Sequence, residues 1–250
     1  MSGSNIEGAF KALFFLIGLC LLVISLIVLP FAIQAHKARQ QKQRDAMASK
    51  ATDLGLDFNE TGDRKKYLHI DQLDDLYGSD KHVLNVLSGD FQGYPVTLFD
   101  FHYATRGVWW WAPSWKIHNY AAFVILNTNK NFPELTIGVE GGGLFKMIAD
   151  AFGGGDIDFE SHEFSERYEV RCKSKKFAYD FCNAQMIDYL LGHPARFIEV
   201  EKDSLAMGFD SQHSAESLES GLSHLLKIRS LMPDYLFGDG VYSNAGSPPL

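Results

Sequence analysis

Residues 12–33 form an unbroken run of 22 residues without a charged side chain. A helix of this length is about 33 Å long at ~1.5 Å per residue, which matches a bilayer core of roughly 30 Å. A cleaved signal peptide is the main alternative, but its apolar region normally spans only about 7 to 15 residues after a basic start. The leader before this run is neutral, because Glu7 balances Lys11. The pattern predicts a retained transmembrane helix over 12–33, preceded by a short extracytoplasmic segment over 1–11.

The following segment, 34–55, is rich in Ala, Gln, Lys and Arg, which favour helices, and Gly55 is a natural stop. We therefore expect the anchor to continue as a basic juxtamembrane helix. Bases close to the end of a membrane helix indicate its cytoplasmic side, so the N-terminus is predicted to lie outside. The bases that could contact lipid headgroups are Lys37, Arg39, Lys42 and Arg44. The alternative is that these bases only determine topology.

The rest of the chain changes its hydrophobic period twice, first to that of strands and then to that of helices. Strands are predicted over 82–88, 95–105, 119–127 and 134–139, and helices over 144–152, 175–191 and 215–231. In the last helix Ser214 is the expected N-cap, and the spacing predicts one apolar stripe of Leu218, Leu222, Leu225 and Leu226. The segment 197–209 is predicted to form a β-hairpin that turns at Lys202 and Asp203. This order favours an α+β domain over 56–237, with a mainly antiparallel sheet and three packed helices. Residues 238–250 are expected to form a flexible tail.

The net charge of −8, from 23 bases and 31 acids, is distributed unevenly. Residues 34–50 carry five bases and one acid, whereas residues 51–250 carry 17 bases and 29 acids, a net charge of −12. A body this acidic repels phosphate backbones, so nucleic acid is not an expected partner. Cys172 and Cys182 are the only cysteines outside the membrane segment, which excludes a disulfide framework.

Three longer phrases carry a resemblance to a known family. They are NVLSGDFQGYPVTLFDFHY at 85–103, IDFESHEFSERYEVRCKSKKFAYDFCNAQM at 157–186 and EVEKDSLAMGF at 199–209. With the apolar helix and the basic segment, the chain resembles a family of uncharacterised bacterial single-pass membrane-anchored proteins with a β-rich cytoplasmic domain. The resemblance implies this layout and brings no activity, substrate or site residue.

All four tryptophans lie within seven residues, between two predicted strands. Tryptophan is favoured both at the membrane interface and in protein–protein hot spots. The segment is therefore a candidate for contact with a partner or with the membrane. The alternative is that the loop folds back and the rings cover the core. The candidate residues are Trp109, Trp110, Trp111, Trp115, Arg106 and Lys116.

One face of the strand 95–105 carries Asp100 and His102, and His118 lies near the start of the returning strand. These three side chains could hold a metal ion or form an acid/base pair. The alternative is a solvated sheet face, which an antiparallel sheet commonly has.

Two further motifs are weaker. Asp156, Asp158, Glu160 and His162 alternate in a way that suits a hard cation, but the glycine and glutamate of a calcium loop are missing. The order of strand, glycines and helix around 141–143 resembles a phosphate-binding loop, but the GK[ST] ending is absent. A solvated acidic segment and a flexible connector are the simpler interpretations.

Together these patterns predict a non-catalytic interaction protein, a scaffold or regulatory subunit, anchored by one pass in an inner or plasma membrane with its domain in the cytoplasm. Its expected partners are membrane lipids and a protein partner or a second copy, and no cofactor is expected. One alternative is a membrane-tethered metal-dependent hydrolase that uses Asp100, His102 and His118. The other is a structural component of a larger membrane assembly.

Overall fold

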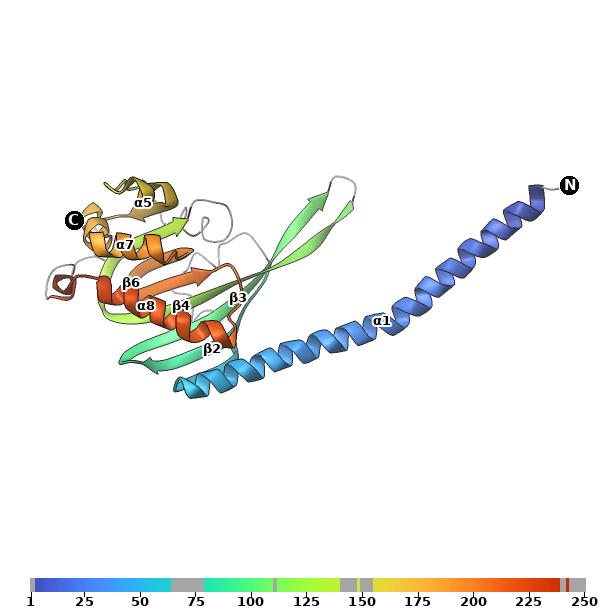
Figure 1. Ribbon diagram of the computed structural model, residues 1–250, viewed down its shortest axis with the longest axis horizontal. Helices are drawn as coiled ribbons and strands as arrows, with labels where there is room; N and C mark the ends of the chain where they lie inside the picture. The colour runs from blue at the N-terminus through green and yellow to red at the C-terminus, as the bar shows by residue number, and fades with distance from the viewer. Residues whose placement is uncertain are drawn as a thin grey trace. The chain divides into compact units, whose positions relative to one another are not determined.

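The computed structural model describes residues 3–63, 79–109, 112–139, 148, 155–238 and 242. The chain divides into two compact units, Met1–Ala46 and Met47–Leu250. The first unit consists of most of helix α1 (Gly3–Asp53). The second contains the end of that helix and an α+β domain (Figure 1).

Helix α1 is, among the described residues, the one helix long and apolar enough to cross a membrane. Its most apolar 18-residue window has a mean hydropathy of 3.0 and none of it is buried. Large apolar side chains such as Phe14, Phe15 and Phe31 are 71 to 74% exposed. An apolar helix without a protein covering is stable in lipid rather than in water. The expected apolar N-terminal helix is thus present, and it continues through the basic segment without a break.

The last two turns of α1 belong to the second unit. Met47 and Ala51 are completely buried in its core, beside Leu56 at the start of the first strand. Lys50 donates to Glu219 over 2.6 Å, which ties this end of the helix to α8 (Ala215–Leu231). One of the five bases counted in residues 34–50 is therefore engaged with the domain.

The domain is built on a six-stranded sheet in which every neighbouring pair is antiparallel. The strands follow the order β1-β2-β3-β4-β5, and β6 also pairs with β4. This confirms the predicted α+β class. The strands are β1 (Leu56–Gly62), β2 (Ser79–Phe91), β3 (Tyr94–Trp109), β4 (Ala112–Val139), β5 (Tyr168–Cys172) and β6 (Phe197–Phe209).

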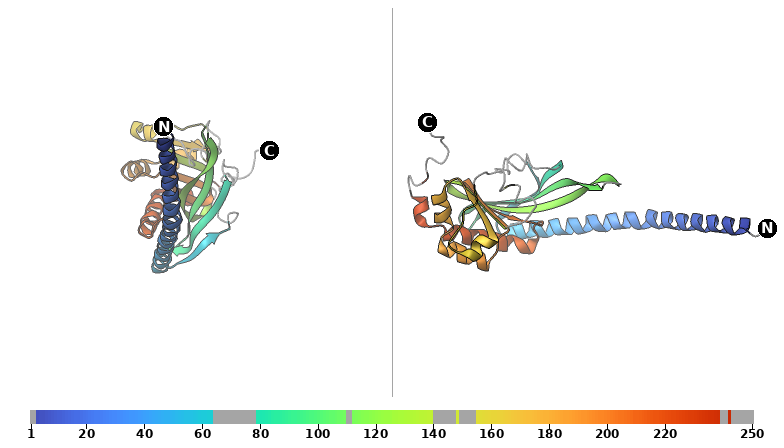
Figure 2. Two further views of the ribbon diagram at one scale, coloured as in Figure 1. Left: turned by 90° about the vertical axis from the view of Figure 1, so that its right-hand side faces the viewer. Right: turned by 90° about the horizontal axis from the view of Figure 1, so that it is seen from above.

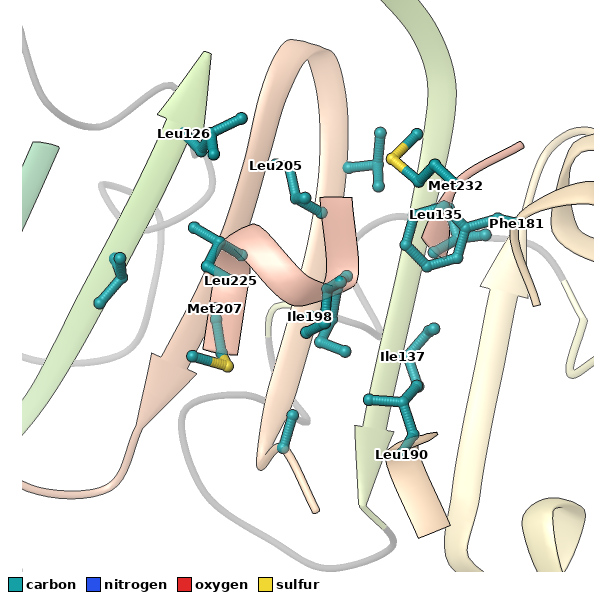
Figure 3. Packing of buried hydrophobic residues seen from close by; sticks show 14 of the residues in the cluster. Leu126, Leu135, Ile137, Phe181, Leu190, Ile198, Leu205, Met207, Leu225 and Met232 are labelled. Atoms are coloured by element: carbon teal, nitrogen blue, oxygen red, sulfur yellow. The ribbon is translucent and has the colours of Figure 1, made fainter. Parts of the chain in front are cut away.

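The segment predicted as a hairpin over 197–209 is β6, an unbroken run of strand residues whose ribbon bends back on itself between Ile198 and Leu205 (Figure 3). Lys202 has a positive φ of 53°, and the residues on both sides of it pair with β4. β4 is irregular opposite this point, between Asn127 and Phe132, where Asn129 has a φ of 55°. Asn127 donates to the Asp203 carboxylate over 2.8 Å and joins the two bulges. Both strands bend together, so β4 also merges two predicted strands into one.

The helix predicted over 175–191 is divided into α6 (Lys175–Phe181) and α7 (Ala184–Gly192). Asn183 separates them, since its side chain accepts hydrogen bonds from the backbone of Gln185 and Met186. Asparagine is among the strongest N-caps, and here it starts a new helix. Helix α5 (His162–Arg167) was not predicted. The predicted helix 144–152 lies outside the described residues, apart from Ile148.

Helix α8 (Ala215–Leu231) matches its prediction, including the N-cap Ser214. Helix α8 lies on one face of the sheet together with α6 and α7 (Figure 2), and its apolar stripe belongs to the core between them. Figure 3 shows how side chains from β4, β6 and the helices interdigitate there. A smaller apolar cluster lies on the opposite face, around Phe99, Phe123 and Phe197.

Candidate functional site

Strands β3 and β4 continue beyond the rest of the sheet as a two-stranded arm (Figure 1). The described pairing of β2 with β3 ends at Ala104, and the pairing of β6 with β4 begins at Ala122. Between these limits β3 and β4 pair with each other, from Tyr103 opposite Asn119 to Trp109 opposite Ala112. We define the arm as residues 105–117. In the described residues, no strand pairs with its outer edges.

Three histidines from three neighbouring strands stack at the base of the arm. The rings of His82 and His102 lie 5.8 Å apart, and those of His102 and His118 lie 5.1 Å apart. His102 is 8% exposed, and the Tyr120 ring lies 4.9 Å from its ring. The sheet register produces this stack, because His82 is opposite His102 and His118 is diagonal to it.

The hydrogen bonds of the stack define its tautomers. His102 Nδ1 lies 3.1 Å from the Asp80 carbonyl oxygen, which can only accept, so this nitrogen carries the proton. In neutral His102 the other nitrogen, Nε2, then accepts from His118 Nδ1 over 2.9 Å. Burial, and then the neighbouring His118, lower the pKa of His102, which favours this neutral form. The Asp80 carbonyl, His102 and His118 thus form a hydrogen-bonded chain, and His82 joins the stack through its ring.

A surface ion pair flanks the stack. Lys116, on the arm, donates to the Asp80 carboxylate, and this hydrogen bond lowers the pKa of Asp80. The Asp80 backbone also holds His102. The same residue therefore joins the start of β2 to both strands at the arm's base.

Asp100 is completely buried, so the face predicted to be solvated is covered at this position. Its carboxylate accepts from Asn85 Nδ2 over 2.7 Å and from the His213 backbone N–H over 2.8 Å. Asn85 lies in a bulge of β2 with a φ of 50°, and His213 directly precedes the N-cap of α8. Burial raises the pKa of Asp100 to about 6, although both hydrogen bonds act in the opposite direction. Asp100 thus ties two strands to a helix.

The predicted trio is therefore brought together only in part. His102 and His118 form a hydrogen bond, whereas the described hydrogen bonds of Asp100 go to Asn85 and His213. Across the described ranges, no group of three or more His, Cys, Asp or Glu side chains could hold a metal ion. The same holds for the acidic segment 156–162, in which Ile157 points into the core while Asp158 and Glu160 are exposed.

The remaining predicted residues lie on the surface or outside the described part. Arg106 is exposed and lies opposite Lys116, which is 56% exposed. Trp110, Trp111 and the glycines at 141–143 lie outside the described residues. The strands include the backbones of Trp109 and Trp115. Of the candidate lipid contacts, Lys37, Arg39 and Lys42 are exposed, and Arg44 is half-buried.

Sequence reasoning missed His82, Asp80, Asn85 and His213. His82 stands at the start of a predicted strand, but only the strand order places it beside His102. His213 directly precedes Ser214, the predicted N-cap of α8, so the position of this cap was the one sequence feature that pointed to His213. The bulge that directs Asn85 into the core has no comparable mark in the sequence.

The fold and the site define a class: an α+β domain that follows an apolar membrane-type helix and carries a projecting β-arm. The sequence matches no protein-family model, and no curated protein matches it significantly. Among solved structures, the chain is similar to the crystal structure of the mycobacterial trehalose monomycolate transport factor A. The match has 13% identity and a TM-score of 0.48, and covers 76% of this chain and 96% of that one. Likeness at this level assigns neither a family nor a function.

Proposed function

We propose that this chain is a membrane-anchored, non-catalytic interaction protein, a scaffold or regulatory subunit at the cytoplasmic face, and that the arm is its contact with a protein partner. The observation that carries the proposal is the arm itself. A two-stranded ribbon alone is marginally stable in water, and its outer edges present unpaired backbone donors and acceptors. Such edges are typical contact surfaces for another chain.

The side chains at the arm's base support the same proposal. Ile117 is 42% exposed and Tyr120 is 36% exposed, and Lys116 and Arg106 lie between them and the tip. Tryptophan, tyrosine and arginine are the residues that contribute most to binding energy at protein interfaces. The metal-dependent hydrolase has no comparable support, because Asp100 serves to hold α8 and is not directed at the two histidines.

We expect the double change Trp110→Ala and Trp111→Ala to leave the domain folded and to lower recovery of a crosslinked partner from native membranes several-fold. The physical reason is that large aromatic side chains dominate interface energetics. Far-UV circular dichroism would check the fold, and quantitative pull-down of the full chain would check binding. Tyr235→Ala, which removes another exposed aromatic ring, is the control.

Two results would contradict this proposal for the arm. An unfolded double variant would show that the rings are part of the core. Unchanged partner recovery together with lost binding to anionic liposomes would show that the tip contacts lipid.

The predicted orientation has its own test. A cysteine at Ser4 should react with a membrane-impermeant maleimide in intact cells, whereas one at the exposed Ser220 of α8 should react only after permeabilisation. The native Cys172 and Cys182 are buried and give little background. Labelling in the reverse order would place the acidic domain outside and overturn the cytoplasmic assignment.

A further inference from the structure

A hollow of about 550 Å³ lies between α6, α7 and the residues 159–161 that lead into α5, far along the chain from the arm. One face of α7 lines it with Ile187, Asp188 and Leu191. Phe159 and Tyr179 also line it, with ring centroids 5.3 Å apart in an edge-to-face arrangement. The Tyr179 hydroxyl donates to the Asp158 carbonyl oxygen over 3.3 Å, which holds its ring in place. The hollow is thus a preformed site with aromatic and aliphatic walls.

The charge of the lining is of one sign. Among the described residues that line it, Glu160 and Asp188 are the only ionisable side chains apart from Tyr179 and the buried Cys182. Both carboxylates are exposed, and among the described residues neither forms an ion pair. The Asn183 side chain satisfies the first backbone N–H groups of α7, so the positive end of that helix is already capped. The hollow therefore favours a cation.

Arginine fits this combination of walls and charge. Its guanidinium stacks on aromatic faces and binds carboxylates through several donors, while its aliphatic stem packs on apolar surface. A bare metal ion fits less well, since no group of three or more ligands is present in the described residues and half of the lining is apolar. An anionic ligand would meet two carboxylates, and the described lining residues include no base.

We propose that the hollow formed by α6, α7 and residues 159–161 binds an arginine side chain presented by a protein partner, with Glu160 and Asp188 as its counterions and Tyr179 as its stacking surface. This inference rests on the proposed interaction function, and it adds a second contact with a stated chemistry. The acidic body, at −12 over residues 51–250, complements the charge of such a partner over a longer range.

The test uses the full chain in nanodiscs, with the Ile187 methyl group observed by NMR. The probe is the dipeptide acetyl-Leu-Arg-amide, and acetyl-Leu-citrulline-amide is its neutral match. We expect a saturable shift of the Ile187 signal by the arginine peptide, with Kd on the order of 1 mM for a single side chain. The citrulline peptide should bind at least tenfold more weakly, and added salt should weaken only the arginine peptide.

Glu160→Gln and Asp188→Asn should each raise Kd about two- to fivefold, as expected for loss of one exposed ion pair. Glu163→Gln removes the same charge from exposed α5 outside the hollow and should leave Kd unchanged. Absence of a saturable shift, equal binding of both peptides, or equal effects of all three variants would overturn the proposal. The arm variant with alanine at Trp110 and Trp111 should bind the dipeptide normally, so failure of the arm and failure of the hollow are distinguishable.

Discussion

Replacing Asp100 with alanine is expected to destabilise the domain by roughly 3 kcal/mol. The change leaves two buried donors, Asn85 Nδ2 and the His213 backbone N–H, without their acceptor, and each unpaired donor costs about 1–3 kcal/mol. Urea denaturation of the full chain, followed by circular dichroism, measures the loss. Asp57→Ala, which removes an exposed carboxylate from β1, should cost under about 0.5 kcal/mol. Equal stability of the two variants would show that Asp100 does not hold α8.

The same carboxyl group gives a pH signature. Because burial raises the pKa of Asp100 from 3.8 to about 6, the folded state retains a proton that the unfolded state loses within this window. The stabilising contribution of Asp100 is therefore complete below pH 3.8 and falls as the pH rises to about 6. The contribution of His213 to stability depends on pH in the opposite direction, because burial lowers the pKa of His213 from 6.5 to about 4. This contribution is complete above pH 6.5 and is lost as the pH falls to about 4. We expect Asp100→Ala to remove the contribution of Asp100 to the pH dependence of stability and to leave those of His213 and of the other buried groups.

The second large effect is expected at Glu199, where Glu199→Gln should stabilise the domain at alkaline pH. Glu199 is 2% exposed on β6, and in the described residues neither carboxyl oxygen has a hydrogen-bond partner. Thr136 lies opposite Glu199 on β4, and its buried hydroxyl also has no hydrogen-bond partner among the described residues. Burial first, and then Glu201 and Glu134, raise the pKa of Glu199 from 4.5 to about 8. Ionisation in this position is opposed by the loss of hydration.

The sign of this effect follows from linkage. A folded-state pKa above the unfolded value makes the unfolding free energy fall as the pH rises from 4.5 to about 8. At about 1.4 kcal/mol per pKa unit, the penalty above pH 8 amounts to a few kcal/mol. Glutamine has the shape of the protonated side chain and cannot ionise, so the variant should match the natural protein near pH 4 and exceed it at pH 9. Chemical denaturation at both pH values tests this.

The control for Glu199 is Glu163→Gln, which changes an exposed carboxylate and should leave the pH profile unaltered. A natural protein whose stability is flat between pH 5 and 9 would contradict the assigned pKa. A large loss of stability in Glu199→Gln at pH 9 would show instead that the ionised carboxylate is needed.

Local patterns predicted the elements whose structure depends on nearby residues. The spacing of Leu218, Leu222 and Leu225 indicated the buried stripe of α8, and Ser214 indicated its start. The uncharged run 12–33 indicated an exposed apolar helix, because its length alone matches a bilayer. In these cases one segment contains all the information that decides its conformation.

Sequence patterns did not predict pairings that a distant segment decides. Both halves of β6, on either side of the predicted turn at Lys202 and Asp203, pair with β4, which is itself irregular around Asn129. The division of the helix predicted over 175–191 has a local cause instead, because the Asn183 side chain caps the start of α7.

The sequence by itself determined the apolar helix, the basic segment after it, the acidic α+β body and the clustering of tryptophans between two strands. Only the tertiary structure decided that Asp100 holds α8, that His82 joins His102 and His118, and that Glu160 and Asp188 share one hollow. The physical reason is that periodicity and caps act within a few residues. Strand order, bulges and helix packing, by contrast, bring together side chains that are tens of residues apart in the sequence. Only this arrangement decides which of these side chains are buried and which charges lie close together.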